Sequence, residues 1–137
     1  MARKPKAIVL DSWSVMAYLE DEPAGEKVES IIADAHENNI PLMMSVVNEA
    51  EIWYLMARLT SEEGADEAVS ELKKLGIEFF EADWKLAHEA ARFKAKNKMS
   101  LADCFAAALA KDRKADLVTG DHEFKQIEGE LKVVWLQ

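Results

Sequence analysis

Short apolar runs alternate along the chain with longer segments in which apolar residues recur at helical spacing. Residues 7–10 form a continuous apolar run, which is typical of a strand buried on both faces. Further strands are predicted over residues 40–44, 77–80, 117–119 and 133–135.

The segments between these runs have the period of amphipathic helices. From Ala24 onward one helical face carries Val28, Ile31, Ile32 and Ala35, all of them apolar. The other helices are predicted over residues 13–20, from Ser45, from Ser61 to a C-terminal Gly76, from Asp83 through Lys94, from Ser100 to about Lys111, and over 123–127. Strands that alternate with helices predict an α/β fold, with a mostly parallel sheet covered by helices on both faces.

Length and composition favour one folded domain over residues 1–137. Half of the residues are hydrophobic, so the chain can bury a core. No apolar run reaches the length of about 18 residues that a membrane span needs, and the first residues lack the apolar stretch of a signal peptide. The single cysteine, Cys104, fits a reducing cytoplasm and a buried position on a packed helix. We therefore expect a cytoplasmic protein that does not associate with membranes.

The formal net charge of −9 argues against simple electrostatic capture of nucleic acid. It does not exclude a nucleic-acid substrate, because cations bound in a carboxylate site would reverse the local sign and attract phosphate. A basic partner protein is the other natural interpretation of this charge.

Acidic residues stand where apolar runs meet helices or turns at four points, namely Asp11, Glu49 or Glu51, Asp103, and Asp121. Asp11 and Asp121 both follow predicted strands, so a parallel sheet would present both at the carboxyl ends of its strands. Ligands of open α/β sheets bind at that edge, near a switch in strand order. We therefore expect these acids to gather there.

Each of these acids also has an ordinary structural explanation. Asp11 could cap the helix at 13–20, and Asp121 could form an Asx-turn or cap the short helix after it. Asp103 could complete a capping box with Ser100. It is, however, the only charge within residues 101–110, and a buried carboxylate is costly without a cation or several hydrogen-bond donors.

The helix after Ser45 offers two acids, and the pattern does not choose between them. Glu49 and Glu51 lie roughly 200° apart around a helix, so only one can face a common site.

Carboxylates without cysteine or histidine are the ligands that hard cations prefer, here Mg²⁺ or Mn²⁺. The histidines, His36, His88 and His122, do not have the spacing of a zinc site. Two such ions roughly 3.5–4 Å apart can activate a water molecule and stabilise the leaving oxygen of an in-line displacement. The acids therefore indicate phosphodiester chemistry.

The motifs around these acids occur in an order that extends over nearly the whole chain. They are Ile8-Val9-Leu10-Asp11-Ser12; Ser45 with Glu51; Ser100-Leu101 with Asp103, Ala107 and Leu109-Ala110; and Leu117-Val118-Thr119 with Asp121 and Phe124. In this order they resemble a PIN domain, and more narrowly the VapC-type toxin ribonucleases of toxin–antitoxin pairs.

The resemblance implies a PIN-like three-layer fold and assigns roles to particular residues. By it, the acids that bind Mg²⁺ or Mn²⁺ are Asp11, Glu51, Asp103 and Asp121, and the hydroxyl groups that support them are those of Ser12 and Thr119. The family's spacing from Ser45 selects Glu51 over Glu49. It further implies an RNA substrate, a homodimer and an antitoxin that blocks the site.

Two positions depart from the family pattern. Trp13 stands where many members have a small serine, so no role of that hydroxyl carries over. Asn48 and Glu49 occupy positions that are often filled by threonine or apolar residues.

The leading hypothesis is a metal-dependent endoribonuclease that acts as a toxin. The alternative is a non-catalytic or signalling module with an acidic pocket, either receiver-like or an inactive PIN interaction domain. A receiver needs a phosphorylatable Asp at the end of a central strand and a Lys at a late strand end. No Asp closes the run at 40–44, and the late strand end carries Asp121.

Overall fold

Five parallel strands form one sheet at the centre of the molecule. In the computed structural model, which describes residues 4–137, the strands are β1 (Ile8–Leu10), β2 (Leu42–Ser45), β3 (Ile77–Phe80), β4 (Asp116–Thr119) and β5 (Val133–Trp135). Their order across the sheet is β3-β2-β1-β4-β5, and every neighbouring pair is parallel. The prediction of a mostly parallel α/β sheet is therefore confirmed.

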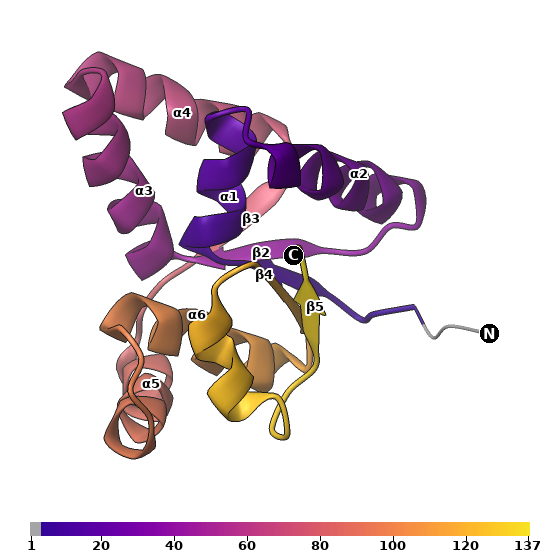
Figure 1. The fold of residues 1–137 in the computed structure, drawn as a ribbon, viewed down its shortest axis with the longest axis vertical. Coiled ribbons are helices and arrows are strands. Elements are labelled where there is room, and N and C mark those ends of the chain that lie inside the picture. The colour runs from indigo at the N-terminus through magenta and orange to yellow at the C-terminus, as the bar shows by residue number, and fades with distance from the viewer. Residues whose placement is uncertain (1–3) are drawn as a thin grey trace.

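Helices cover both faces of this sheet, which gives three layers (Figure 1). The helices are α1 (Ser12–Leu19), α2 (Pro23–Glu37), α3 (Val46–Leu59), α4 (Glu62–Lys74), α5 (Trp84–Lys96), α6 (Leu101–Arg113) and the 3₁₀ helix η1 (His122–Ile127). Alternate side chains of β1 serve the two cores. Val9 packs in the core beneath α5 and α6, whereas Ile8 and Leu10 pack against α1 to α4.

Local side-chain hydrogen bonds explain where most of these helices begin. The Oγ of Ser45 accepts the backbone N–H groups of Val47 and Asn48, each at 3.2 Å, and Ser61, Asp83 and Ser100 cap their helices in the same way. Gly76 follows α4 with φ +85°, the left-handed conformation that glycine adopts most readily. The predicted elements are thus all present, with boundaries displaced by up to about three residues.

The strand order changes direction between β1 and β4. The chain builds outward from β1 to β2 and β3, then returns to place β4 on the other side of β1. Receiver domains have the order 2-1-3-4-5, so the receiver-like alternative is wrong. The carboxyl ends of β1 and β4, where Asp11 and Asp121 follow, lie at the switch point.

Cys104 is fully buried on α6, as predicted. Among residues 4–137, no helix combines the length and the apolar character needed to cross a bilayer.

Candidate metal centre

An open groove of about 690 Å³ lies at the carboxyl edge of the sheet. Its lining comes from α1, the turn after α1, α3, the first turn of α6 and the start of η1, and its acids are Glu20, Glu22, Glu51, Asp103, Asp121 and Glu123. A second groove, of about 740 Å³, runs beside Tyr18 and Glu71, but none of the four predicted acids lines it. The candidate chemistry therefore belongs to the groove at the switch point.

Asp103 enters this groove from the first turn of α6. Its backbone N–H donates to Ser100 Oγ at 3.1 Å, so Ser100 caps the helix as predicted. The return bond of a capping box is not made, because the Ser100 N–H donates instead to Glu123 Oε1 at 3.3 Å. The Asp103 carboxylate therefore does not bond back to the Ser100 N–H, although the residue is only 7% exposed.

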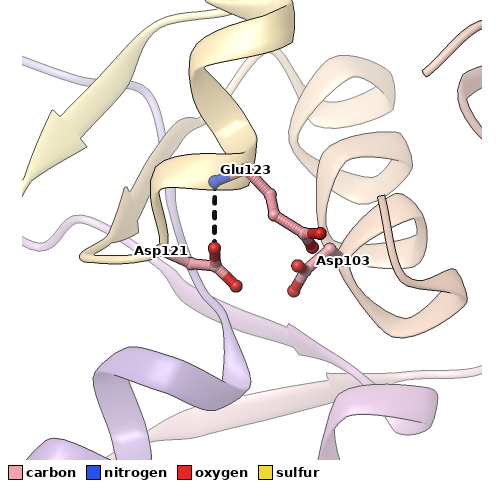
Figure 2. Close-up of side chains that lie close together, drawn as sticks. All are labelled: Asp103, Asp121 and Glu123. Carbon is pink, nitrogen blue, oxygen red and sulfur yellow. Dashed lines mark hydrogen bonds between the residues drawn. The ribbon is translucent and has the colours of Figure 1, made fainter. Parts of the chain in front are cut away.

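Three carboxylates meet at this point. Oxygen atoms of Asp103, Asp121 and Glu123 all lie within 4.8 Å of one another (Figure 2). Burial, followed by the nearby Glu123 and Asp121 carboxylates, raises the pKa of Asp103 well above its ordinary value. No ion pair found within residues 4–137 involves any of the three, so no side-chain cation of the described chain neutralises them.

Asp121 has the local role that its sequence context suggested. Its Oδ1 accepts the backbone N–H of Glu123 at 2.9 Å, which caps η1 (Figure 2). The same turn brings Glu123 alongside Asp103. The capping interpretation and membership of the acidic cluster are therefore both correct for this residue.

Asp11 lies behind the groove and is fully buried. Its Oδ1 accepts the N–H of Ser14 at 2.9 Å, which caps α1, and its Oδ2 accepts the hydroxyl of Thr119 at 2.5 Å. Burial raises the pKa of Asp11 to about 6, while the hydrogen bonds from Thr119 and Ser14 act in the opposite direction. Thr119 Oγ1 also accepts the N–H of Asp121 at 2.9 Å, so it links the two acids.

The two glutamates of α3 differ in position. Glu51 is half-buried and lines the groove, whereas Glu49 is not part of the lining. Three of the four predicted acids thus line the groove, with Asp11 buried behind it. Glu51 is nevertheless outside the tight cluster, whose third member is Glu123.

Sequence reasoning missed Glu123, which it treated only as the first residue of a short helix. The sequence feature that could have identified Glu123 is its spacing of two residues from Asp121. In the tight turn between them, both carboxylates point toward Asp103 (Figure 2).

Asn48, noted as a departure from the family pattern, joins three elements beneath the acids. Its Nδ2 donates to Ser12 Oγ at 3.2 Å and to the Ala102 carbonyl at 3.1 Å, and its Oδ1 accepts from Ser45 Oγ at 2.9 Å. The residue is fully buried. Through these hydrogen bonds Asn48 connects Ser12 of α1 and Ala102 of α6 to α3.

Trp13, the other departure, packs over Gly120. A Cβ atom built at position 120 would overlap the six-membered ring of Trp13, so this packing requires the glycine. Trp13 also lines the groove.

One protein-family model and several solved structures match most of the chain. The PIN domain family model matches residues 8–130. DNA-bound VapBC from Salmonella typhimurium superposes with a TM-score of 0.74 at 16% identity, covering 96% of this chain and 98% of that chain. VapBC2 from Rickettsia felis, bound to a promoter fragment, gives 0.72 at 17% identity, covering 93% and 97%. VapC20 from Mycobacterium tuberculosis, a toxin that cleaves the Sarcin-Ricin loop, gives 0.68 at 16%, covering 88% and 94%. No curated protein matches the chain significantly in sequence.

Proposed function

The chain belongs to the PIN domain family, and on that premise we propose that it is a metal-dependent endoribonuclease, the toxin of a toxin–antitoxin pair. One observation carries the proposal. The buried Asp103 has two further carboxylates within 4.8 Å and no cationic side chain of residues 4–137 paired with it. Such an arrangement is unfavourable unless a proton or a cation compensates it.

The donor set suits Mg²⁺ or Mn²⁺. Every candidate ligand is a carboxylate oxygen, and hard cations prefer such ligands and retain waters that phosphate oxygens can replace. His122 is the histidine nearest to Asp121 in the sequence, but it is not part of the cluster. Its ring centroid lies 6.0 Å from that of Trp135, in an edge-on contact. Asp103, Asp121 and Glu51 would hold the ion, with Glu123 beside them.

The chain's own residues would then have distinct tasks. A divalent ion in such a site supplies Lewis acidity toward a phosphate oxygen and lowers the pKa of a water molecule. Asp103 would lose the proton that its raised pKa favours, because cation binding replaces that proton. Asp11 would hold Thr119, and through it the backbone at Asp121, in a fixed position. Glu51 would orient the ion or a water from α3.

The toxin assignment is the finer part of the proposal. Several proteins of the same fold were solved as VapBC complexes, and one is described as a toxin that cleaves the Sarcin-Ricin loop. We accordingly propose RNA as the substrate, a cognate antitoxin as the protein partner, a homodimer as the assembly, and the cytoplasm as the location. The net charge of −9 suits a basic antitoxin segment that covers the groove.

The test is cleavage of single-stranded RNA by purified protein with Mg²⁺, with Mn²⁺ and with EDTA. Asp103→Asn should abolish a metal-dependent activity, because a neutral amide holds a hard cation poorly. Asp11→Asn should abolish it too, because an amide nitrogen in place of Oδ2 cannot accept the Thr119 hydroxyl that links Asp11 to the backbone at Asp121. Asp34→Asn, an exposed acid on α2, is the matched control and should retain it. Full activity in EDTA would overturn the metal mechanism. Binding of Mn²⁺ without cleavage would instead identify an inactive PIN interaction domain.

A further inference from the structure

Six acids line the groove, among them Glu20 and Glu22 from the turn after α1, and beside them is a wall of apolar side chains with one arginine. This wall consists of Trp13 and Met16 from α1 and of Leu55, Arg58 and Leu59 from α3. We call these five residues the apolar wall, although they include the cation Arg58. Leu55, Arg58 and Leu59 follow Glu51 at helical spacing, so they continue the face of α3 that carries this acid. A chain of nucleotides that reached the acids along α3 would have to pass over them.

Arg58 is the only basic side chain that lines the groove within the described part of the chain. Its guanidinium lies over the ring of Tyr54, 4.9 Å from the centroid, and no ion pair found within residues 4–137 involves it. Seven residues separate it from Glu51, which is about 10 Å along a helix axis. Arg58 therefore lies about two helical turns beyond Glu51 on α3.

We propose, building on the proposed function, that the apolar wall binds the single-stranded RNA next to the bond that is cut. Arg58 takes a phosphate adjacent to the scissile one, since a guanidinium matches phosphate oxygens in charge and geometry. Trp13 and its apolar neighbours take an unpaired base, because bases stack on aromatic rings with little dependence on sequence. Arg58 is thus a positioning residue for the substrate, and it requires the bases to be unpaired.

Continuity with the acidic cluster and the position of Arg58 favour RNA as the occupant. On α3 the apolar wall begins one helical turn after Glu51 and so shares one groove with the acids, where a bound cation would attract the scissile phosphate. Arg58 offers a second anion contact at the far end, with apolar side chains in between. This arrangement suits a nucleotide whose base contacts the apolar side chains and whose two flanking phosphates reach the acidic site and Arg58.

The binding test uses Asp103→Asn protein, which removes cleavage and leaves the apolar wall intact. The probe is a fluorescein-labelled single-stranded octaribonucleotide of mixed sequence, followed by anisotropy in Mg²⁺ at several salt concentrations. Adding Arg58→Ala should weaken binding about tenfold, as expected for one charge-assisted contact. It should also reduce the slope of log K against log salt by about 0.7, the value for one phosphate contact on a single strand.

Arg113→Ala is the matched control. Arg113 also lies over an aromatic ring, that of Phe80 at 4.5 Å, but it stands at the other end of α6 from Asp103. This substitution should leave both affinity and slope unchanged, whereas Arg58→Lys should retain most of the salt dependence. Trp13→Leu should weaken binding without changing the slope, because stacking involves no charge. The complementary duplex of the same RNA should bind less tightly.

Failure of this inference and failure of the nuclease proposal give different results. In the otherwise unsubstituted enzyme, Arg58→Ala should raise KM about tenfold and leave kcat within about twofold. Active enzyme whose KM and RNA affinity are insensitive to Arg58→Ala would overturn the inference and leave the nuclease standing. An inactive wild type whose RNA affinity still depends on Arg58 would overturn the nuclease and support the inference. No RNA binding at all would overturn the inference and leave the apolar wall to a protein partner.

Discussion

Replacing Asp103 with Asn should stabilise the metal-free protein while removing its response to cations. The carboxylate is buried beside Asp121 and Glu123, which raises its pKa. A raised folded-state pKa contributes stability only below the unfolded pKa, and this contribution is lost as the pH rises through the folded value. At neutral pH the metal-free Asp103 carboxyl therefore destabilises the fold. An amide at the same position is neutral and does not titrate, so it lacks this destabilising contribution.

The magnitude follows from the distance between the working pH and the ordinary pKa. A carboxyl that stays protonated at pH 7 in the folded state, against an ordinary pKa of 3.8, destabilises folding by at most about 4 kcal/mol. In a domain of this size about 1 kcal/mol shifts Tm by roughly 2–4 °C. Since the buried amide has desolvation costs of its own, we expect Asp103→Asn to raise Tm in EDTA by about 5–10 °C.

The assay is a set of melting curves for wild type and variant, each in EDTA and in Mn²⁺. Wild type should be stabilised by Mn²⁺ through mass action, and Asp103→Asn should not. Ser100→Ala is the informative control, because it removes the cap of α6 and leaves the acids in place. It should destabilise the protein by about 1 kcal/mol and keep the Mn²⁺ response. If Asp103→Asn behaves like Ser100→Ala, the carboxylate has a structural role only and the reasoning is refuted.

Four other predictions concern the remaining acids and the biology. Glu51→Gln should greatly reduce RNA cleavage and Glu49→Gln should not, as measured by initial rates; the reverse would show that the wrong acid of α3 was chosen. Glu123→Gln should weaken Mn²⁺ binding in calorimetry, whereas unchanged affinity would leave Glu123 outside the metal site. Because the pKa of Asp11 is raised from 3.8 to about 6, the metal-free protein should lose stability in denaturant titrations as the pH rises from about 4 through 6, and a rise over that range would contradict the assignment. Expression without the antitoxin should arrest growth, and co-expression should yield a complex with masked activity; harmless expression of a metal-binding protein would argue against a toxin.

The sequence alone determined most of the fold, because the interactions that define its elements are local. Helix starts at Ser45 and Ser100 depend on hydrogen bonds to backbone groups two or three residues away, and the helix end at Gly76 depends on one dihedral angle. Hydrophobic periodicity is likewise a property of a single helix or strand, so it can be recognised in the sequence without the tertiary structure. The same locality made the capping roles of Asp11 and Asp121 predictable, and these proved compatible with a place in or directly behind the acidic site.

Only the tertiary structure decided which acids meet. The order of the strands places β4 beside β1, so that Thr119 bonds to Asp11 across 108 residues of sequence. The same arrangement sets Asp103 of α6 against the turn at Asp121 and brings in Glu123, which the sequence analysis had not singled out. Burial, and with it the raised pKa values, arises from elements that pack together from distant parts of the chain. Spacing in the sequence can therefore place a carboxylate at the end of a strand, but only the packing of those elements sets how far it lies from the next one.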